Sequence, residues 1–274
     1  MENDDQPIGR VLTRREALSL LGLTGAAVLA ACAPRQSDTT QSTSTATQAA
    51  ASPSTSTPAS ESAQVTATTS TTALPACIVR PEVTEGPYYV DADYDRSDIR
   101  SDPSTGIVKE GAQLTLTFLV SQIANGAADG QIGCTPLEGA KVEIWHCDAD
   151  GVYSGVSDPG FDTTGQKFLR GFQTTNANGQ ATFVTIYPGW YSSRCVHIHF
   201  KIHHDSTDSS RVFTSQLFFD DSLSDQVLSQ PPYASKGQRD TLNSNDRIYE
   251  DQLLLNTVQA GDSYMATFDI GLQF

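Results

Sequence analysis

Two histidines separated by a single residue are the strongest hint of chemistry in this sequence. His197 and His199 lie in the segment 196–202, where apolar residues occupy the alternate positions. A β-strand points successive side chains to opposite faces, so both imidazoles should project from one face and could hold one metal ion. A polar sheet face or a hydrogen-bonded core pair would produce the same pattern. The remaining residues must therefore decide whether a metal site is present.

Two tyrosines at turns add a second kind of metal ligand. Tyr153 follows a polar turn after the predicted strand 141–146, and Tyr191 follows Pro188-Gly189 after another predicted strand. Phenolate is a hard anionic ligand that suits Fe(III) better than Zn(II) or Cu(I), and a trivalent ion can displace the phenolic proton. We expect both tyrosines at loop mouths of the same sheet. Either ring could instead cap the core with its hydroxyl in water.

An arginine and a glutamine nearby could act on an anionic ligand. Arg194 lies three residues before His197, where a guanidinium would balance charge and stabilise a developing carbanion or oxyanion. Gln216 lies in a predicted strand that is otherwise apolar or hydroxylic, and a buried amide there needs hydrogen-bond partners. The structural alternatives are a surface salt bridge for Arg194 and a core hydrogen bond for Gln216.

The elements that must position these residues are almost all β-strands. Alternation and residue type predict about seven of them, at 113–120, 141–146, 168–174, 180–186, 196–202, 212–219 and 263–270. Loops rich in glycine, proline and asparagine separate the strands, and the one helical prospect is 222–228. We therefore expect an all-β fold, an antiparallel β-sandwich of about seven to nine strands with long loops.

The first 32 residues are typical of an export signal. Arg14 and Arg15 form a twin-arginine pair, and the apolar segment 18–31 that follows is shorter than the roughly 20 residues of a membrane span. The segment ends in Leu-Ala-Ala-Cys32, a lipobox pattern. We expect export by the twin-arginine route and membrane contact only through a lipid anchor at Cys32, in an extracytoplasmic position. An uncleaved short membrane anchor is the alternative.

The rest of the chain divides into a linker and one domain. Residues 33–74 are a Ser/Thr/Ala/Pro tract with too little apolar surface to fold, so they are predicted to be a disordered tether. Residues 75–274 are long enough for a single core. The formal net charge of −15 argues against nucleic acid or an anionic surface as a partner. The predicted organisation is thus a signal segment at 1–32, a linker at 33–74 and a β-sandwich domain at 75–274.

Four cysteines follow Cys32, and an exported chain permits disulfides between them. Cys134 and Cys147 flank a predicted strand, so a bond between them would require the chain to double back. A bond from Cys77 to either of them is favoured. Cys195 is expected to be free or disulfide-bonded rather than a metal ligand.

Several short motifs occur in a fixed order along the predicted domain. They are Glu85-Gly-Pro-Tyr-Tyr89, Val142-Glu-Ile-Trp145 continuing to Gly151-Val-Tyr153, Phe168-Leu-Arg-Gly171, Thr185-Ile-Tyr-Pro-Gly189 and Arg194-Cys-Val-His-Ile-His199. In this order they resemble the intradiol ring-cleavage dioxygenases, and more closely the exported, stand-alone relatives of the protocatechuate 3,4-dioxygenase β subunit. The resemblance extends from about Cys77 to the C-terminus.

The resemblance implies a non-haem Fe(III) ion with four protein ligands, Tyr153, Tyr191, His197 and His199. It also implies catalytic roles for Arg194, Gln216 and Tyr191, the last as the ligand that leaves the metal when substrate binds. Tyr88 or Tyr89 would line the substrate pocket. The implied reaction inserts both atoms of O2 between the two hydroxylated carbons of a catechol-type aromatic and gives a cis,cis-muconate-type diacid. No organic cofactor is required.

Three other interpretations use the same residues. One is a zinc hydrolase built on the two histidines and a carboxylate, which would not need the tyrosines. Another is an exported iron- or catechol-binding β-sandwich module without turnover, which would not need Arg194 and Gln216. The third is a tethered adhesion domain in which these residues are incidental.

Overall fold

The computed structural model describes residues 78–91, 93–124, 133–204 and 211–273. The predicted signal segment, Cys32, the predicted linker and Cys77 lie outside these residues. No helix in the described part of the chain is long and apolar enough to cross a membrane.

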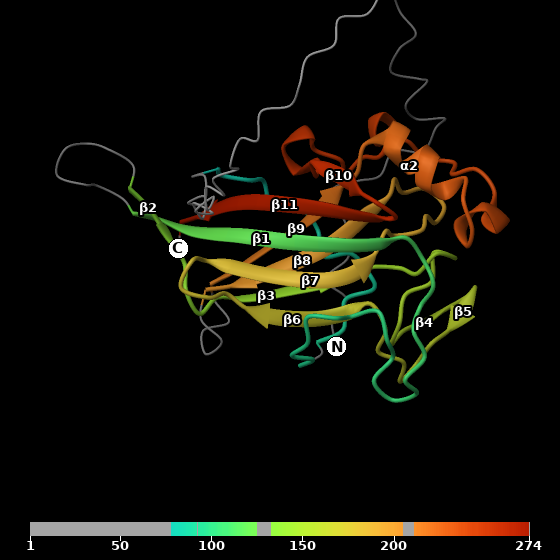
Figure 1. The fold of residues 1–274 in the computed structure, drawn as a ribbon, viewed down its shortest axis with the longest axis horizontal. Coiled ribbons are helices and arrows are strands. Elements are labelled where there is room, and N and C mark those ends of the chain that lie inside the picture. The colour runs from blue at the N-terminus through green and yellow to red at the C-terminus, as the bar shows by residue number, and fades with distance from the viewer. Residues whose placement is uncertain (1–77, 92, 125–132, 205–210, 274) are drawn as a thin grey trace, which may run out of the picture. The chain divides into compact units, whose positions relative to one another are not determined.

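Nine strands of the described residues form two sheets (Figure 1). The five-stranded sheet has the order β10–β11–β1–β2, and β7 also pairs with β1. Its strands are β1 (Gln113–Ala124), β2 (Gly133–Pro136), β7 (Gln180–Ile186), β10 (Thr257–Ala260) and β11 (Ser263–Leu272). The four-stranded sheet has the order β6–β3–β8–β9. Its strands are β3 (Lys141–Trp145), β6 (Arg170–Thr174), β8 (His197–His203) and β9 (Val212–Phe218).

The remaining elements lie at one end of the sandwich, on the right in Figure 1. A two-stranded ribbon is made of β4 (Ser157–Asp158) and β5 (Phe161–Asp162). Helix α2 spans Asp221–Leu228 and is capped by Asp220, whose side chain accepts a hydrogen bond from the Leu223 amide. Three 3-10 turns follow, at Tyr233–Lys236, Asn243–Asn245 and Asp251–Leu253.

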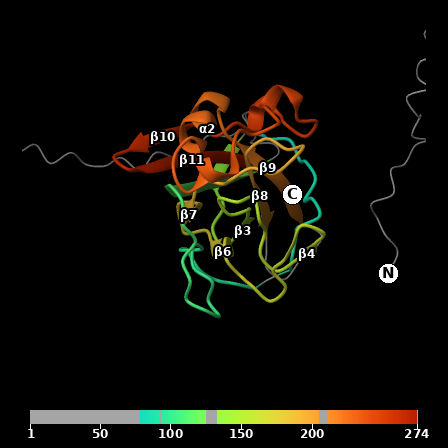
Figure 2. The same cartoon turned by 90° about the vertical axis from the view of Figure 1, so that its right-hand side faces the viewer.

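The predicted all-β sandwich is confirmed, with one difference in strand direction. β1 and β11 pair in parallel, with Leu114 opposite Tyr264, whereas the sequence predicted an antiparallel arrangement throughout. Parallel neighbours need a long crossover connection, and α2 with the three 3-10 turns lies in the long stretch between them. In the view of Figure 2 the strands of both sheets are seen nearly end-on.

The core lies between the two sheets and fixes one face of β8. Phe200 of β8 packs against Phe118 of β1, with ring centroids 5.3 Å apart, and against Phe268 of β11 at 5.5 Å. Burial of each such ring contributes roughly 1.5–3 kcal/mol. Because side chains alternate along a strand, the burial of Ile198 and Phe200 in this core turns His197 and His199 to the opposite face.

The states of the three described cysteines exclude one of the two predicted disulfide pairs. Cys134 is disulfide-bonded, whereas Cys147 and Cys195 are free and buried. The alternative in which Cys147 pairs with Cys77 was therefore wrong. The partner of Cys134 lies outside the described residues. β8 begins two residues after Cys195, so this thiol is not part of the strand face that carries the histidines.

Candidate metal centre

Strand β8 brings His197 and His199 together on one buried face. Their Nε2 atoms are 3.1 Å apart, and the two residues are 2% and 1% exposed. His197 Nδ1 donates to the carbonyl oxygen of Cys195 at 2.7 Å, which leaves the Nε2 lone pair free to bind a metal. Burial lowers the pKa of His197 to about 3 and that of His199 well below its ordinary value, so both rings are neutral at physiological pH.

Packing rather than hydrogen bonding orients the His199 ring. Trp145, which is opposite His199 in the sheet register, stacks on it with ring centroids 5.1 Å apart and planes 8° apart. The backbone at Gly86 comes so close to the ring that a Cβ there would lie 3.0 Å from His199 Cε1. His199 Nδ1 has no hydrogen-bond partner among the described residues. Packing against Trp145 and Gly86 therefore holds the His199 ring with its Nε2 directed toward the cluster.

Two tyrosines approach His197 from different sheets. The hydroxyl of Tyr153 lies 3.3 Å from His197 Nε2, and the hydroxyl of Tyr191 lies 3.2 Å from the same atom. Tyr153 follows β3 of the four-stranded sheet, but Tyr191 follows β7 of the five-stranded sheet. The prediction that both stand at loop mouths of one sheet was therefore wrong. The chain crosses between the sheets after β7, and the crossing brings Tyr191 beside Tyr153 with rings 5.8 Å apart.

The two tyrosine-bearing loops are packed backbone to backbone. Asp148 organises the first loop, because its Oδ1 accepts the Val152 amide at 2.9 Å and its Oδ2 pairs with Lys109 at 2.8 Å. In the second loop, a Cβ at Gly189 would lie 2.4 Å from the Asp148 carbonyl oxygen. Only glycine permits this approach, so Gly189 fixes the position of one loop against the other.

In this cluster of Tyr153, Tyr191, His197, His199 and Arg194, more polar atoms surround His197 Nε2 than this nitrogen can hydrogen-bond. Four lie within 3.4 Å of His197 Nε2, namely the hydroxyls of Tyr153 and Tyr191, Nε2 of His199 and Nη1 of Arg194. An unprotonated imidazole nitrogen has one lone pair and accepts one hydrogen bond. The hydroxyl and imidazole contacts of 3.1–3.3 Å are instead those of ligands about 2 Å from a shared cation. The side chains of Tyr153, Tyr191, His197 and His199 therefore fit a metal ion.

The chemistry of the donors favours a hard, highly charged ion. Within the described ranges, no group of three or more His, Cys, Asp and Glu side chains is placed to hold a metal, so a complete ligand set requires the phenols. Burial raises the pKa of Tyr153 well above its ordinary value and also raises that of Tyr191. Each phenol thus keeps its proton until a cation replaces it, which a trivalent ion does most readily.

Arg194 and Gln216 form a linked pair beside the cluster. Arg194 Nη2 donates to Gln216 Oε1 at 2.5 Å, and Gln216 Nε2 donates to the carbonyl oxygen of Thr84 at 2.7 Å. Arg194 Nε also donates to Asp246 Oδ2 at 2.9 Å, and Asp246 accepts the Cys195 amide through the same oxygen. Burial opposes the charge of Arg194, but Tyr191 and Asp246 raise its pKa above the ordinary value. Arg194 is a partly buried cation paired with the buried Asp246, rather than part of a surface salt bridge.

The side chains of Tyr88 and Tyr89 pack against different residues. The Tyr88 ring stacks on Tyr153 at 4.5 Å and meets Tyr191 edge-on at 5.9 Å. Tyr89 packs against Trp145 at 5.1 Å, outside this tyrosine group. Burial and a hydrogen bond to a nearby carboxylate raise the pKa of Tyr88 to about 12. Of the two tyrosines predicted to line a pocket, Tyr88 is the one in contact with the cluster.

Two residues that hold the cluster in place were not predicted from the sequence. Asp246 lies 52 residues after Arg194 in an irregular segment, where no local pattern singles it out. Arg170 donates to the carbonyl oxygens of Ser154 and Tyr88, each at 2.6 Å, and so ties two segments of the site together. The one sequence signal for Arg170 is its place in the motif Phe168-Leu-Arg-Gly171.

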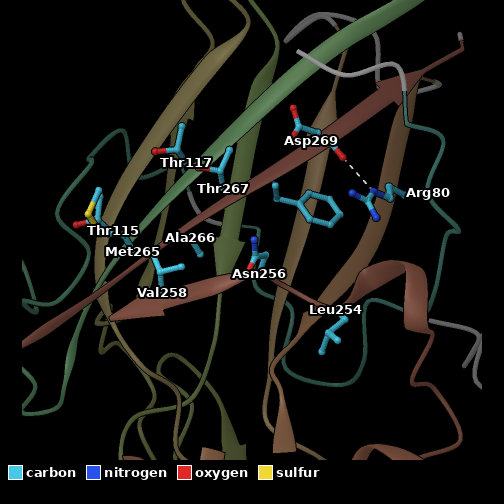
Figure 3. Close-up of a pocket in the computed structure, with 11 residues that line it drawn as sticks. Arg80, Thr115, Thr117, Leu254, Asn256, Val258, Met265, Ala266, Thr267 and Asp269 are labelled. Carbon is cyan, nitrogen blue, oxygen red and sulfur yellow. Dashed lines mark hydrogen bonds between the residues drawn. The ribbon is translucent and has the colours of Figure 1, made fainter. Parts of the chain in front are cut away.

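A separate hollow of about 420 Å³ lies beside β1, β10 and β11 (Figure 3). Threonine and aliphatic side chains dominate its lining, and Arg80 donates to the carbonyl oxygen of Asp269 at its edge at 3.0 Å. None of the cluster residues lines it. The hollow is therefore not the candidate centre.

The sequence and the fold match a known class of enzyme. The family model described as "Dioxygenase" matches residues 84–273, which include every residue of the cluster. The chain belongs to the intradiol ring-cleavage dioxygenase family. A similar solved structure is the intradiol ring-cleavage dioxygenase from Tetranychus urticae, with 32% sequence identity and a TM-score of 0.60. That similarity covers 72% of this chain and 94% of the mite protein.

Two curated relatives are bacterial catechol dioxygenases. Catechol 1,2-dioxygenase of Acinetobacter baylyi is 32% identical over 163 residues, and catechol 1,2-dioxygenase 1 of Acinetobacter lwoffii is 29% identical over 163 residues. Each match covers 50% of this chain and 45% of the relative. The chain thus spans slightly less than half the length of these relatives.

Proposed function

We propose that this protein is a ferric dioxygenase that opens the ring of a catechol-type aromatic. Iron would be held by four side chains, Tyr153, Tyr191, His197 and His199. The observation that carries the proposal is the convergence of their donor atoms, with contacts of 3.1–3.3 Å around His197 Nε2. Both atoms of O2 enter between the two hydroxylated carbons, and a cis,cis-muconate-type diacid results. The diacid contains every atom of the catechol together with both oxygen atoms, so no further reductant is needed.

Each side chain of the cluster has a separate role in the proposed reaction. Ferric iron, when bound, supplies a Lewis acid that draws electron density from a coordinated catecholate and makes it reactive toward O2. Tyr191 is only half-buried, so it is the tyrosine able to move. With iron bound it would be a phenolate, whose oxygen can take a proton from a catechol hydroxyl and become a neutral phenol. Tyr153 is 0% exposed and stays in place. Arg194 stabilises negative charge on the ring, and Gln216, held between Arg194 and Thr84, orients the reacting group.

A visible spectrum of the iron-loaded protein tests this function. Tyrosinate-to-Fe(III) charge transfer should colour the protein, catechol should shift the band, and oxygen uptake should accompany formation of the diacid. Tyr153→Phe should lose part of the band and most of the oxygen uptake. A colourless iron complex, with Tyr153→Phe equal to wild type in oxygen uptake, would contradict the proposal. A band that shifts without oxygen uptake would instead identify a binding module.

We also propose that the protein is exported by the twin-arginine route and anchored to the cell envelope through Cys32, with residues 33–74 as a disordered tether. The support is the sequence pattern of residues 1–32. In cell fractionation, wild-type protein should be recovered with membranes, and Cys32→Ala should release it into the soluble extracytoplasmic fraction. Replacing both Arg14 and Arg15 with lysine should keep the protein in the cytoplasm. Membrane association that survives Cys32→Ala would favour an uncleaved anchor.

A further inference from the structure

The candidate centre combines fully buried residues with partly exposed ones. Tyr153, His197 and His199 are 0%, 2% and 1% exposed, so the interior side of the cluster is closed. Tyr88 and Tyr191 are only half-buried, and their rings meet edge-on at 5.9 Å. Arg194, which contacts the cluster, is also partly exposed. A ligand can therefore approach the cluster beside the two rings and Arg194.

A carboxylate stands beside the first of these rings. The hydroxyl of Tyr88 donates to Asp158 Oδ2 at 2.9 Å, and Asp158 Oδ1 accepts the Gly160 amide at 3.1 Å. Asp158 belongs to the β4–β5 ribbon, which also places Phe161 against Tyr88 with rings 6.2 Å apart. Within the described residues, no Lys, Arg or His side chain forms an ion pair with Asp158. Its hydrogen bonds come from the neutral Tyr88 hydroxyl and Gly160 amide, and among these residues no cation is paired with it.

A second carboxylate borders the loop of the other ring. Asp240 Oδ2 accepts a hydrogen bond from the Ser192 hydroxyl at 2.6 Å, and Asp240 Oδ1 accepts the Ser193 amide at 3.2 Å. Both serines directly follow Tyr191 in the chain. One carboxylate thus contacts the Tyr88 hydroxyl, and a second contacts the two residues that follow Tyr191.

Two of the three cations near the centre are paired with carboxylates. Three contact the cluster or the two tyrosines of the segment 85–89, namely Arg194, Arg170 and Lys201. Arg194 pairs with Asp246, which is only 1% exposed. Lys201 pairs with Glu85 at 2.5 Å and lies over the Tyr89 ring. Arg170 donates to backbone carbonyl oxygens, has no carboxylate partner among the described residues, and its Nη1 has no hydrogen-bond partner. It is only 4% exposed, so an anion in solvent has little access to its charge.

We infer that the site selects an uncharged catechol ring over a catechol that carries a carboxylate, and that Asp158 is a specificity-determining residue. The inference rests on the proposed function. A substituent carboxylate entering beside Tyr88 would face Asp158 in a half-buried setting, where like charges repel more strongly than in water. An uncharged substituent of similar size would meet no such repulsion.

Anaerobic titration of the iron-loaded protein measures this selectivity as binding, without turnover. Three ligands separate charge from size: catechol, 4-methylcatechol and 3,4-dihydroxybenzoate. The two uncharged ligands should bind with similar dissociation constants, and 3,4-dihydroxybenzoate roughly threefold to tenfold more weakly. High salt should narrow the difference. If 4-methylcatechol binds as weakly as 3,4-dihydroxybenzoate, size is the cause and the inference is wrong.

Two variants on the same ribbon locate the effect. Asp158→Asn removes the charge but keeps an oxygen that can accept the Tyr88 hydroxyl, so the three ligands should then bind almost equally. Asp162→Asn is the matched control and should leave the selectivity unchanged. Among the described residues, the Asp162 side chain bonds only to Thr164 of its own turn. An unchanged selectivity in Asp158→Asn would overturn the inference. If no ligand shifts the spectrum even of wild type, the proposed function itself fails.

Discussion

Replacing His197 with alanine is expected to remove iron binding and oxygen uptake together. His197 Nε2 is the atom that both hydroxyls and the second imidazole approach, with contacts of 3.1–3.3 Å. Loss of an outer partner of a metal ligand costs about 10–100-fold in affinity, and loss of a ligand itself should cost more than about 100-fold. The measurement is iron content after dialysis against a weak chelator, together with the visible spectrum.

His203→Ala is the matched control for this experiment. His203 lies on the same face of β8 but at its far end, where its Nε2 is 3.8 Å from Glu143 rather than near the cluster. This variant should keep wild-type iron content and colour. Thermal unfolding of both variants without iron should show that each still folds. Full iron retention by His197→Ala would show that the cluster is not the metal site.

Gly189→Ala is expected to have the second largest effect, on stability and on the site at once. The added methyl group would lie 2.4 Å from the carbonyl oxygen of Asp148 and 2.5 Å from that of Ala149, and both are backbone atoms that cannot rotate away. Overpacking of this kind costs about 1–3 kcal/mol, and here it also pushes apart the two loops that carry the tyrosines. We expect a lower midpoint in urea unfolding and a weaker tyrosinate band.

Gly133→Ala provides the comparison for the same chemical change. A Cβ at Gly133 would meet only the Ala124 side chain, at an ordinary 3.7 Å. Its stability should change by no more than about 0.5 kcal/mol. If Gly189→Ala unfolds at the same urea concentration as Gly133→Ala, then the close approach of the two loops does not constrain the site.

Regular alternation made most of the strands predictable. β7 was predicted at 180–186 and is observed at Gln180–Ile186, because its alternation is clear and a turn signal precedes it. β10 was missed because Thr257–Ala260 is mostly exposed and owes its pairing to β11 rather than to its own pattern. β1 extends past the predicted residue 120, because residues 121–124 pair with β2.

The candidate site was predictable where its residues follow strands, and not where distant segments meet. Alternation alone turned both histidines to one face of β8, and the turns after strands singled out Tyr153 and Tyr191. The sequence did not show that the two tyrosines come from different sheets, because that depends on strand order. Asp158 was also missed, because its contact with Tyr88 joins residues 70 positions apart.

The parallel pairing of β1 with β11 also determines when the site can form during folding. β1 lies between β7 and β11, and its Phe118 supports Phe200 from behind the histidines. Leu114 must find Tyr264 across most of the domain, and such distant pairing costs loop-closure entropy and slows folding. We therefore expect the support behind the histidines, to which Phe268 of β11 contributes, to be completed late in folding. The export route proposed above carries proteins already folded and would tolerate this delay, since the proposed metal could be loaded before the protein leaves the cell.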